Sequence, residues 1–339
     1  MDVSVLIATS NRIDSLLRTL QNIEDQYLDG ASCEVVIVEN GSDTLRLDSF
    51  SNSSMTFRTI KQTRAGRARA LNTALDVSHG ELLLFTDDDV TLPTHWIREL
   101  RAASLRHPDC PVFCGPIVPL FPVGTPDWLS KHAFRLHFFV DFTPDLPEGP
   151  LPFGHLGAGP NFAVRSRAVR RIRFREDLGP SAKNGALTGD DTEFLHRLRQ
   201  RTGPAVYVPD APVLHHIRAE QIETPWLLER AFHLGRTMAT LNPEMLRPIR
   251  VELDSRPTQD ETPAPSKMLQ VSAILNYYLG QLYQREATKI GQRHVARLYS
   301  FLGELEKEYI HTIGPSASKY LSTQPKLFFL TATRLNFCE

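Results

Sequence analysis

The chain has 339 residues, enough for one full α/β domain with an extension, and its formal net charge at pH 7 is −1. Charges of both signs are mixed along it, so we expect no nucleic-acid partner. The four cysteines include no paired ligands of the kind that structural zinc requires. The first residues lack the pattern of a signal peptide, and no apolar run reaches about 18 residues. We therefore expect a cytoplasmic protein.

The first ninety residues alternate strand and helix patterns. Short, β-branched apolar runs are typical of buried parallel strands, and apolar residues three or four apart are typical of helices. The expected strands are Val3–Ala8, Glu34–Val38, Thr56–Ile60 and Glu81–Thr86, and the expected helices lie between Ile13 and Ile23 and over Gly66–Val77. The polar residues Thr9 to Asn11 form a turn and helix-cap signal. This order predicts a Rossmann-like sheet flanked by helices.

Two common nucleotide-binding classes are disfavoured by the turn after the first strand. This turn, Ala8-Thr9-Ser10-Asn11-Arg12, contains no glycine, so the dinucleotide-binding fingerprint is missing. The chain also has no Gly-Lys-Ser/Thr loop of the Walker type. An NAD enzyme or a P-loop nucleotidase is therefore not expected.

The middle of the chain has a different composition. Eleven of the 24 prolines lie between Pro108 and Pro160, which predicts long shaped loops in place of regular structure. A glycine-rich segment, Gly154–Asn161, is either a plain turn or a backbone that approaches a substrate closely. It leads into an expected strand at Phe162–Arg165, and a helix over Phe194–Leu198 and a strand at Ala205–Val208 follow.

The last third of the chain has helical patterns on both sides of a proline-rich, charged linker near 254–266. Three roles stay open for these helices: a dimer interface, a lid, or contact with a membrane surface. The apolar run Leu327–Leu330 lies between two basic residues, but a core helix explains so short a run as well.

Three adjacent carboxylates, Asp87, Asp88 and Asp89, directly follow the apolar run Leu82–Phe85. Such concentrated negative charge requires compensation, and carboxylate oxygens suit Mg²⁺ or Mn²⁺ shared with substrate phosphates. The alternative is a solvated turn in which Asp89 or Thr91 caps a helix started by Pro93.

Two other strands help to decide between these alternatives. In Rossmann-like sheets, ligands bind beyond the carboxyl ends of the strands. Thr9 and Ser10, Glu39 and Asn40, and the acidic triplet all lie at such ends. The coincidence favours a ligand site over a turn alone.

Arginines lie near the predicted helix that begins around Gly66. A helix N-terminus attracts a diphosphate, and a guanidinium can bind it through two hydrogen bonds. Among Arg64, Arg67 and Arg69 we assign this role to Arg67, the alternative being an exposed arginine that is only solvated.

Five segments together resemble an inverting family-2 glycosyltransferase with the A-type nucleotide-sugar fold. They are Val3–Arg12, Val35–Asp43, Gly66–Leu75, Leu83–Asp89 and Gly189–Asp191, in the family's order and spacing. The resemblance covers roughly residues 1–220. It implies a mostly parallel mixed sheet, with a nucleotide-binding half at 1–107 and an acceptor-binding half at 108–220. The helical patterns that follow, outside the resemblance, predict a helical extension over 221–339.

The resemblance also implies site residues. Asp89 and Asp87 would hold Mn²⁺ or Mg²⁺, and His215 or His216 follows a strand where some members place a histidine near the metal; we favour His215 as a ligand. Asp191 would be the catalytic base and Asp190 would orient an acceptor group or the base. Asn40 replaces the acid that usually reads the nucleobase, which leaves the base open. The expected donor-binding residues are Thr9, Asn11, Arg12, Glu39, Asn40, Arg67, Asp87 and Asp88.

The implied activity is metal-dependent, inverting transfer of a sugar from a nucleoside-diphosphate sugar to a hydroxyl group. The acceptor could be a glycan, a lipid-linked saccharide or a small molecule. The protein itself could be a homodimer, and it could contact a membrane surface peripherally. Candidates for an apolar acceptor wall are Trp128, His132, Phe138, Phe139 and Phe153, although core packing explains most of them too. The rival functions are an inactive sugar-nucleotide-binding or interaction protein and a nucleotidyltransferase.

Overall fold

A computed structural model describes most of the first 223 residues. The described residues are 1–42, 47, 50, 53–125, 129–130, 139–152, 157–180, 188–223, 226–227, 229–230, 233 and 236–237. The chain divides into two compact units, 1–125 with 139–218 and 126–138 with 219–339. The predicted linker near 254–266, the helices expected beyond it and all the proposed wall residues except Phe139 lie outside the described residues. Among the residues that are described, no helix is long and apolar enough to span a membrane.

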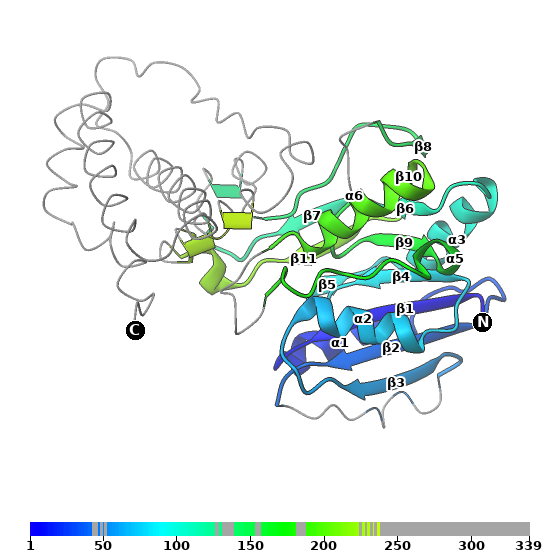
Figure 1. Cartoon of the computed structure of the whole chain (residues 1–339). Helices are drawn as coiled ribbons and strands as arrows, with labels where there is room; N and C mark the ends of the chain where they lie inside the picture. The colour runs from blue at the N-terminus through cyan, green and yellow to red at the C-terminus, as the bar shows by residue number, and fades with distance from the viewer. Residues whose placement is uncertain are drawn as a thin grey trace, which may run out of the picture. The chain divides into compact units, whose positions relative to one another are not determined.

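The first unit is built on a mixed sheet whose eight described strands lie in the order β3-β2-β1-β4-β9-β6-β10-β8 (Figure 1). Strand β9 runs antiparallel to both neighbours and β8 runs antiparallel to β10, while the other pairs are parallel. The prediction of a mostly parallel mixed sheet is confirmed. The strand bounds are β1 Val3–Thr9, β2 Cys33–Glu39, β3 Thr56–Lys61, β4 Leu82–Thr86, β6 Val112–Cys114, β8 Gly149–Pro150, β9 Phe162–Arg165 and β10 Ala205–Tyr207.

A second, three-stranded sheet lies next to the acidic triplet. Its strands are β5 (Val90–Thr91), β11 (Val213–His216) and β7 (Ile117–Leu120), in the order β5-β11-β7. Because β5 directly follows Asp89 and pairs with β11, His215 is brought opposite Val90. Residues more than 120 positions apart in the sequence thus meet at one end of the molecule's main sheet.

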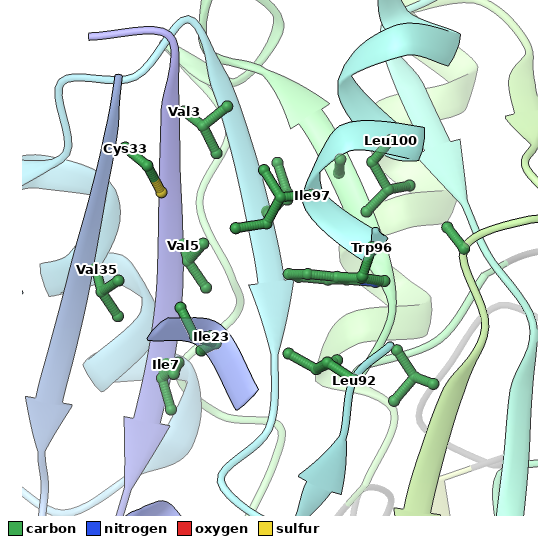
Figure 2. Close-up of a cluster of buried hydrophobic side chains, with 14 of the residues drawn as sticks. Val3, Val5, Ile7, Ile23, Cys33, Val35, Leu92, Trp96, Ile97 and Leu100 are labelled. Carbon is green, nitrogen blue, oxygen red and sulfur yellow. The ribbon is translucent and has the colours of Figure 1, made fainter. Parts of the chain in front are cut away.

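Helices cover both faces of the main sheet (Figure 1). The described helices are α1 (Ile13–Glu24), α2 (Arg67–Val77), α3 (Trp96–Arg106), the short α5 (Ser166–Val169), α6 (Asp190–Thr202) and the 3₁₀ turn η2 (Ala219–Ile222). Helices α1 and α3 pack on one face and α2 and α6 on the other. Strand residues alternate between the two cores, so both faces are buried, as expected of a doubly covered sheet. Figure 2 shows the fully buried Trp96 of α3 between Ile97 and Leu92 in the first core.

Two expectations about local structure are wrong. The region 108–160 contains strands β6, β7 and β8 in spite of its prolines. Proline is tolerated at sheet edges, and Pro119 and Pro150 lie in the edge strands β7 and β8. The polar turn at Thr9 to Asn11 provides no cap either, because the N-cap of α1 is Arg12, whose side chain makes no capping hydrogen bond.

The turn-only alternative for the acidic triplet is also wrong. A helix does follow, but α3 begins at Trp96 and its N-cap is His95. Thr91 belongs to strand β5 instead, and Asp89 bonds basic side chains. The triplet therefore has another role than capping.

Candidate active site

The candidate site lies at the carboxyl edge of the parallel strands. Thr9 of β1 is in register with Glu39 of β2, and Thr86 of β4 pairs with Ile7, so the triplet that follows Thr86 emerges beside Thr9. Strand β9 is antiparallel and starts opposite Phe85, which brings the glycine-rich segment before it to the same edge. The predicted clustering of these strand ends is confirmed.

Asp87, Asp89 and His215 form a cluster that could hold a metal ion. Each offers one ligand atom, and the three atoms lie within 4.8 Å of one another. The Nε2 atom of His215 is 3.3 Å from Oδ1 of Asp89. The ring of His216, by contrast, lies 2.7 Å from the Thr91 hydroxyl and ties β11 to β5. Of the two histidines that the sequence left open, the geometry brings His215 to the carboxylates.

Asp88 is fully buried and faces the protein. Its Oδ2 accepts a hydrogen bond of 2.6 Å from the Thr9 hydroxyl, and its Oδ1 lies 2.7 Å from a guanidinium nitrogen of Arg12. Burial raises the pKa of Asp88 to about 6; the charge of Arg12 opposes this rise, and the charge of neighbouring Asp89 contributes to it. The sequence assigned Thr9, Arg12 and Asp88 to the donor, but here they bind one another. A donor contact by these side chains stays a prediction.

Asp89 contacts three basic side chains, those of Arg12, His215 and Arg218. Its Oδ2 accepts from Arg12 at 2.7 Å and from Arg218 at 3.2 Å. Burial opposes ionisation of Asp89, but His215 and the two arginines outweigh it and lower its pKa to about 2. The sequence prediction missed Arg218. Its position three residues after His215, just past β11, was the signal available.

The side chain of Asn40 bonds the segment that precedes α2. Its Nδ2 donates to the carbonyl oxygens of Gln62, at 3.0 Å, and Arg64, at 2.8 Å, while its Oδ1 accepts from the Gly66 amide at 2.6 Å. Three of the four hydrogen-bonding directions of this amide are used, and only one acceptor direction on Oδ1 is left to read a nucleobase. The other two predicted donor residues nearby are also engaged: Asn11 accepts from Ser42, and Glu39 lies 3.5 Å from Lys61.

Arg67 joins two acidic groups that are far apart in the sequence. It is the first residue of α2, and its Nη2 donates to Asp87 and its Nη1 to Asp190, each at 2.8 Å. Coulombic attraction from these carboxylates raises the pKa of Arg67 well above its usual value, in spite of burial. The sequence prediction had given Arg67 a diphosphate, not a pair of aspartates, as its partner.

Asp191 lies in the first turn of α6 beside the glycine-rich segment. Its Oδ2 accepts from the Gly159 amide, and its Oδ1 accepts from the Thr192 amide at 2.7 Å. Burial and then the charge of Asp190 raise the pKa of Asp191. A carboxyl group that gains affinity for a proton is a better general base, and its environment is of the kind found at functional sites.

The match to known families decides the assignment. Residues 4–173 match the family model described as glycosyl transferase family 2. The chain belongs to this family. The matched residues include the ends of β1, β2 and β4, whereas Asp190, Asp191 and His215 lie beyond them. The sequence-based recognition of glycosyl transferase family 2 is confirmed.

Two relatives of known name share part of the sequence. The succinoglycan biosynthesis protein ExoM of Rhizobium meliloti is 27% identical over 183 residues, which are 53% of this chain and 54% of that protein. The glucosyl-dolichyl phosphate glucuronosyltransferase of Haloferax volcanii is 24% identical over 262 residues, 72% of this chain and 79% of the relative. The chain thus spans about half the length of ExoM.

The fold of this family-2 chain has a counterpart among solved structures. S. aureus TarS 1-349, in its complex with UDP-GlcNAc, superposes with a TM-score of 0.54 at 15% identity, covering 98% of this chain and 88% of that one. The likeness concerns the fold, and it agrees with the A-type architecture that the sequence predicted.

Proposed function

We propose that the protein is a metal-dependent, inverting glycosyltransferase that uses a nucleoside-diphosphate sugar. The observation that carries the proposal is that Arg67 joins Asp87 of the candidate metal cluster to Asp190, which directly precedes Asp191, the carboxylate of raised pKa. Membership in glycosyl transferase family 2 supports the reaction class. A nucleotidyltransferase would need a glycine-rich basic loop after β1, and that loop is lacking.

The acidic cluster suits a hard divalent cation. Carboxylate oxygens are preferred by Mn²⁺ and Mg²⁺, and a neutral imidazole is a common additional ligand. Asp87, Asp89 and His215 would hold the ion. When bound, it supplies Lewis-acid stabilisation of the leaving diphosphate. Arg12 and Arg218 both form ion pairs with Asp89, and they add positive charge where a diphosphate would bind.

Asp191 is our choice for the general base. The acceptor oxygen attacks C1 of the sugar from the face opposite the diphosphate, and its proton passes to the Asp191 carboxylate. The C1–oxygen bond to the diphosphate breaks, and the nucleoside diphosphate leaves with that electron pair. One displacement inverts the configuration at C1, and no covalent enzyme intermediate is needed.

The named relatives favour a saccharide acceptor. One is named for succinoglycan biosynthesis and the other for transfer to glucosyl-dolichyl phosphate, which is a lipid-linked saccharide. We infer that the acceptor here is a growing glycan, carried on a lipid. Peripheral attachment of a cytoplasmic enzyme to a membrane is part of this proposal.

The test is donor binding and donor hydrolysis with Mn²⁺, screened over UDP-, dTDP- and GDP-sugars. Asp89→Ala should lose donor binding because a metal ligand is removed. Asp191→Asn should keep donor binding but lose about 10²- to 10⁴-fold in turnover, the usual contribution of a general base. Asp177→Asn is the matched control, because Asp177 is an exposed partner of Arg175 outside the site.

Two results would overturn parts of the proposal. Wild-type turnover that persists in a chelator would remove the metal requirement. Full activity of Asp191→Asn would remove Asp191 as the base. An inactive binding protein, the remaining rival, would bind a nucleotide sugar and never hydrolyse it.

A further inference from the structure

We propose that Arg67 is a positioning residue that fixes the acidic end of α6 to the carboxylate after β4, and that it is not a ligand of the donor diphosphate. The inference rests on the proposed function, since it assigns Asp191 as the group being positioned. It concerns four side chains or backbone groups from four segments: Arg67, Asp87, Asp190 and Gly159.

The guanidinium group is matched to two carboxylates. Its two terminal nitrogens each bond a different aspartate at 2.8 Å, Nη2 to Asp87 and Nη1 to Asp190. Asp190 is buried, and its Oδ2 lies against the Arg67 guanidinium. A planar guanidinium holds two acceptors in a fixed relation, which an ammonium group cannot do. The fork of Arg67 thereby sets the distance between the start of α6 and the end of β4.

The backbone packs closely around this bridge. A Cβ atom at Gly159 would lie 2.6 Å from Oδ2 of Asp191 and 2.9 Å from Nη2 of Arg67, so a larger residue here would displace one or both of these side chains. The glycine-rich segment had been expected to approach a substrate or to form a plain turn. Its described residues, 157–161, contain a turn, and the Gly159 amide donates to Asp191. Approach of this backbone to a substrate stays a prediction.

Arg67 is itself held from two sides. Its amide donates to the carbonyl of Pro180 at 3.3 Å, shortly before α6. Gly66, which precedes it, is bonded to Asn40 at the end of β2. The backbone at Arg67 is therefore tied to the edge of the sheet, and both terminal nitrogens of its guanidinium group make hydrogen bonds. A group with these constraints is suited to holding Asp190 and Asp191 in place.

The two roles for Arg67 predict different kinetics. A diphosphate ligand makes charged hydrogen bonds, whose loss in Arg67→Met would weaken nucleoside-diphosphate binding about 10- to 100-fold. A positioning residue leaves binding changed by less than about tenfold, while a misplaced base lowers donor turnover about 100-fold. Arg67→Lys also discriminates: a lysine restores the positive charge near a phosphate but cannot bridge two carboxylates.

The experiment measures binding of UDP and GDP with Mn²⁺ by calorimetry, and donor hydrolysis, for the full chain and its variants. We expect Arg67→Met and Arg67→Lys to keep nucleotide affinity and to lose turnover alike. Arg69→Met is the matched control on the same helix, because Arg69 bonds Glu176 and the carbonyl of Ala65 instead. Loss of affinity in Arg67→Met that Arg67→Lys restores would overturn the inference.

A second readout does not depend on enzyme activity. If Arg67 and Asp190 form one bridge, the melting-temperature losses of Arg67→Met and Asp190→Asn should be strongly non-additive in the double variant. Additive losses would contradict the bridge. A wild-type protein that binds no nucleotide, yet shows this non-additivity, would refute the proposed function and leave the bridge standing.

Discussion

At the scale of single residues, several polar side chains at the carboxyl edge of the sheet bond the protein itself. Asn40 is the clearest case. Its place after β2 identified it as a site residue, and its amide suggested a nucleobase as the partner. The structure gives it three backbone partners in the segment 62–66. Hydrogen-bond partners depend on the path of a loop, and no periodicity in the sequence reports that path.

Asn40→Asp tests this assignment. A carboxylate cannot donate to the carbonyl oxygens of Gln62 and Arg64, and it places negative charge against them. We expect a loss of about 1 to 2 kcal/mol in the free energy of unfolding, measured in urea. The matched control is Asn11→Asp, which retains the acceptor that Ser42 bonds. Equal stability of Asn40→Asp and wild type would mean that the amide does not hold this segment.

At the scale of elements, the buried strands and the amphipathic helices of the first ninety residues were predictable because apolar periodicity encodes them. Strands β6, β7 and β8 were not, because each has only two to four residues and prolines surround them. The second sheet consists of β7 and the equally short β5 and β11, so the approach of His215 to Asp89 could not be derived from spacing. The sequence nevertheless placed Asp191 and the acidic triplet at one edge.

The side chain of Asn161, which directly precedes β9 and is fully buried, connects segments of the two sheets. Its Nδ2 donates to the carbonyls of Pro116 and Ala211, both at 2.7 Å, and its Oδ1 accepts from the Trp96 indole at 2.8 Å. These contacts join α3, the turn before β7 and the turn before β11.

Asn161→Ala would remove the hydrogen-bond partner of two buried groups, the Trp96 indole and the carbonyl of Ala211. The carbonyl of Pro116 would keep its hydrogen bond from the Val213 amide. We expect the free energy of unfolding to fall by about 2 kcal/mol or more, as each buried group without a partner typically costs about 1 to 3 kcal/mol. Chemical denaturation provides the measurement. A loss below about 0.5 kcal/mol, typical of exposed positions, would show that Asn161 does not hold these segments together.

At the scale of the whole molecule, the first unit is a doubly covered α/β sheet whose carboxyl edge gathers acidic and basic side chains from six segments. Fold and family were predictable from five short segments in order, since each marks a strand end or a helix start at that edge. Donor and acceptor identity were not, because they depend on loops and on chain segments that carry no such marks.

The most direct test of the account is the anomer that wild-type protein first releases when water replaces the acceptor. An α-linked nucleotide sugar that binds with Mn²⁺ is hydrolysed, and the sugar product is followed by ¹H NMR before mutarotation. A single displacement assisted by Asp191 predicts the β-anomer first. Initial release of the α-anomer would contradict the inverting mechanism.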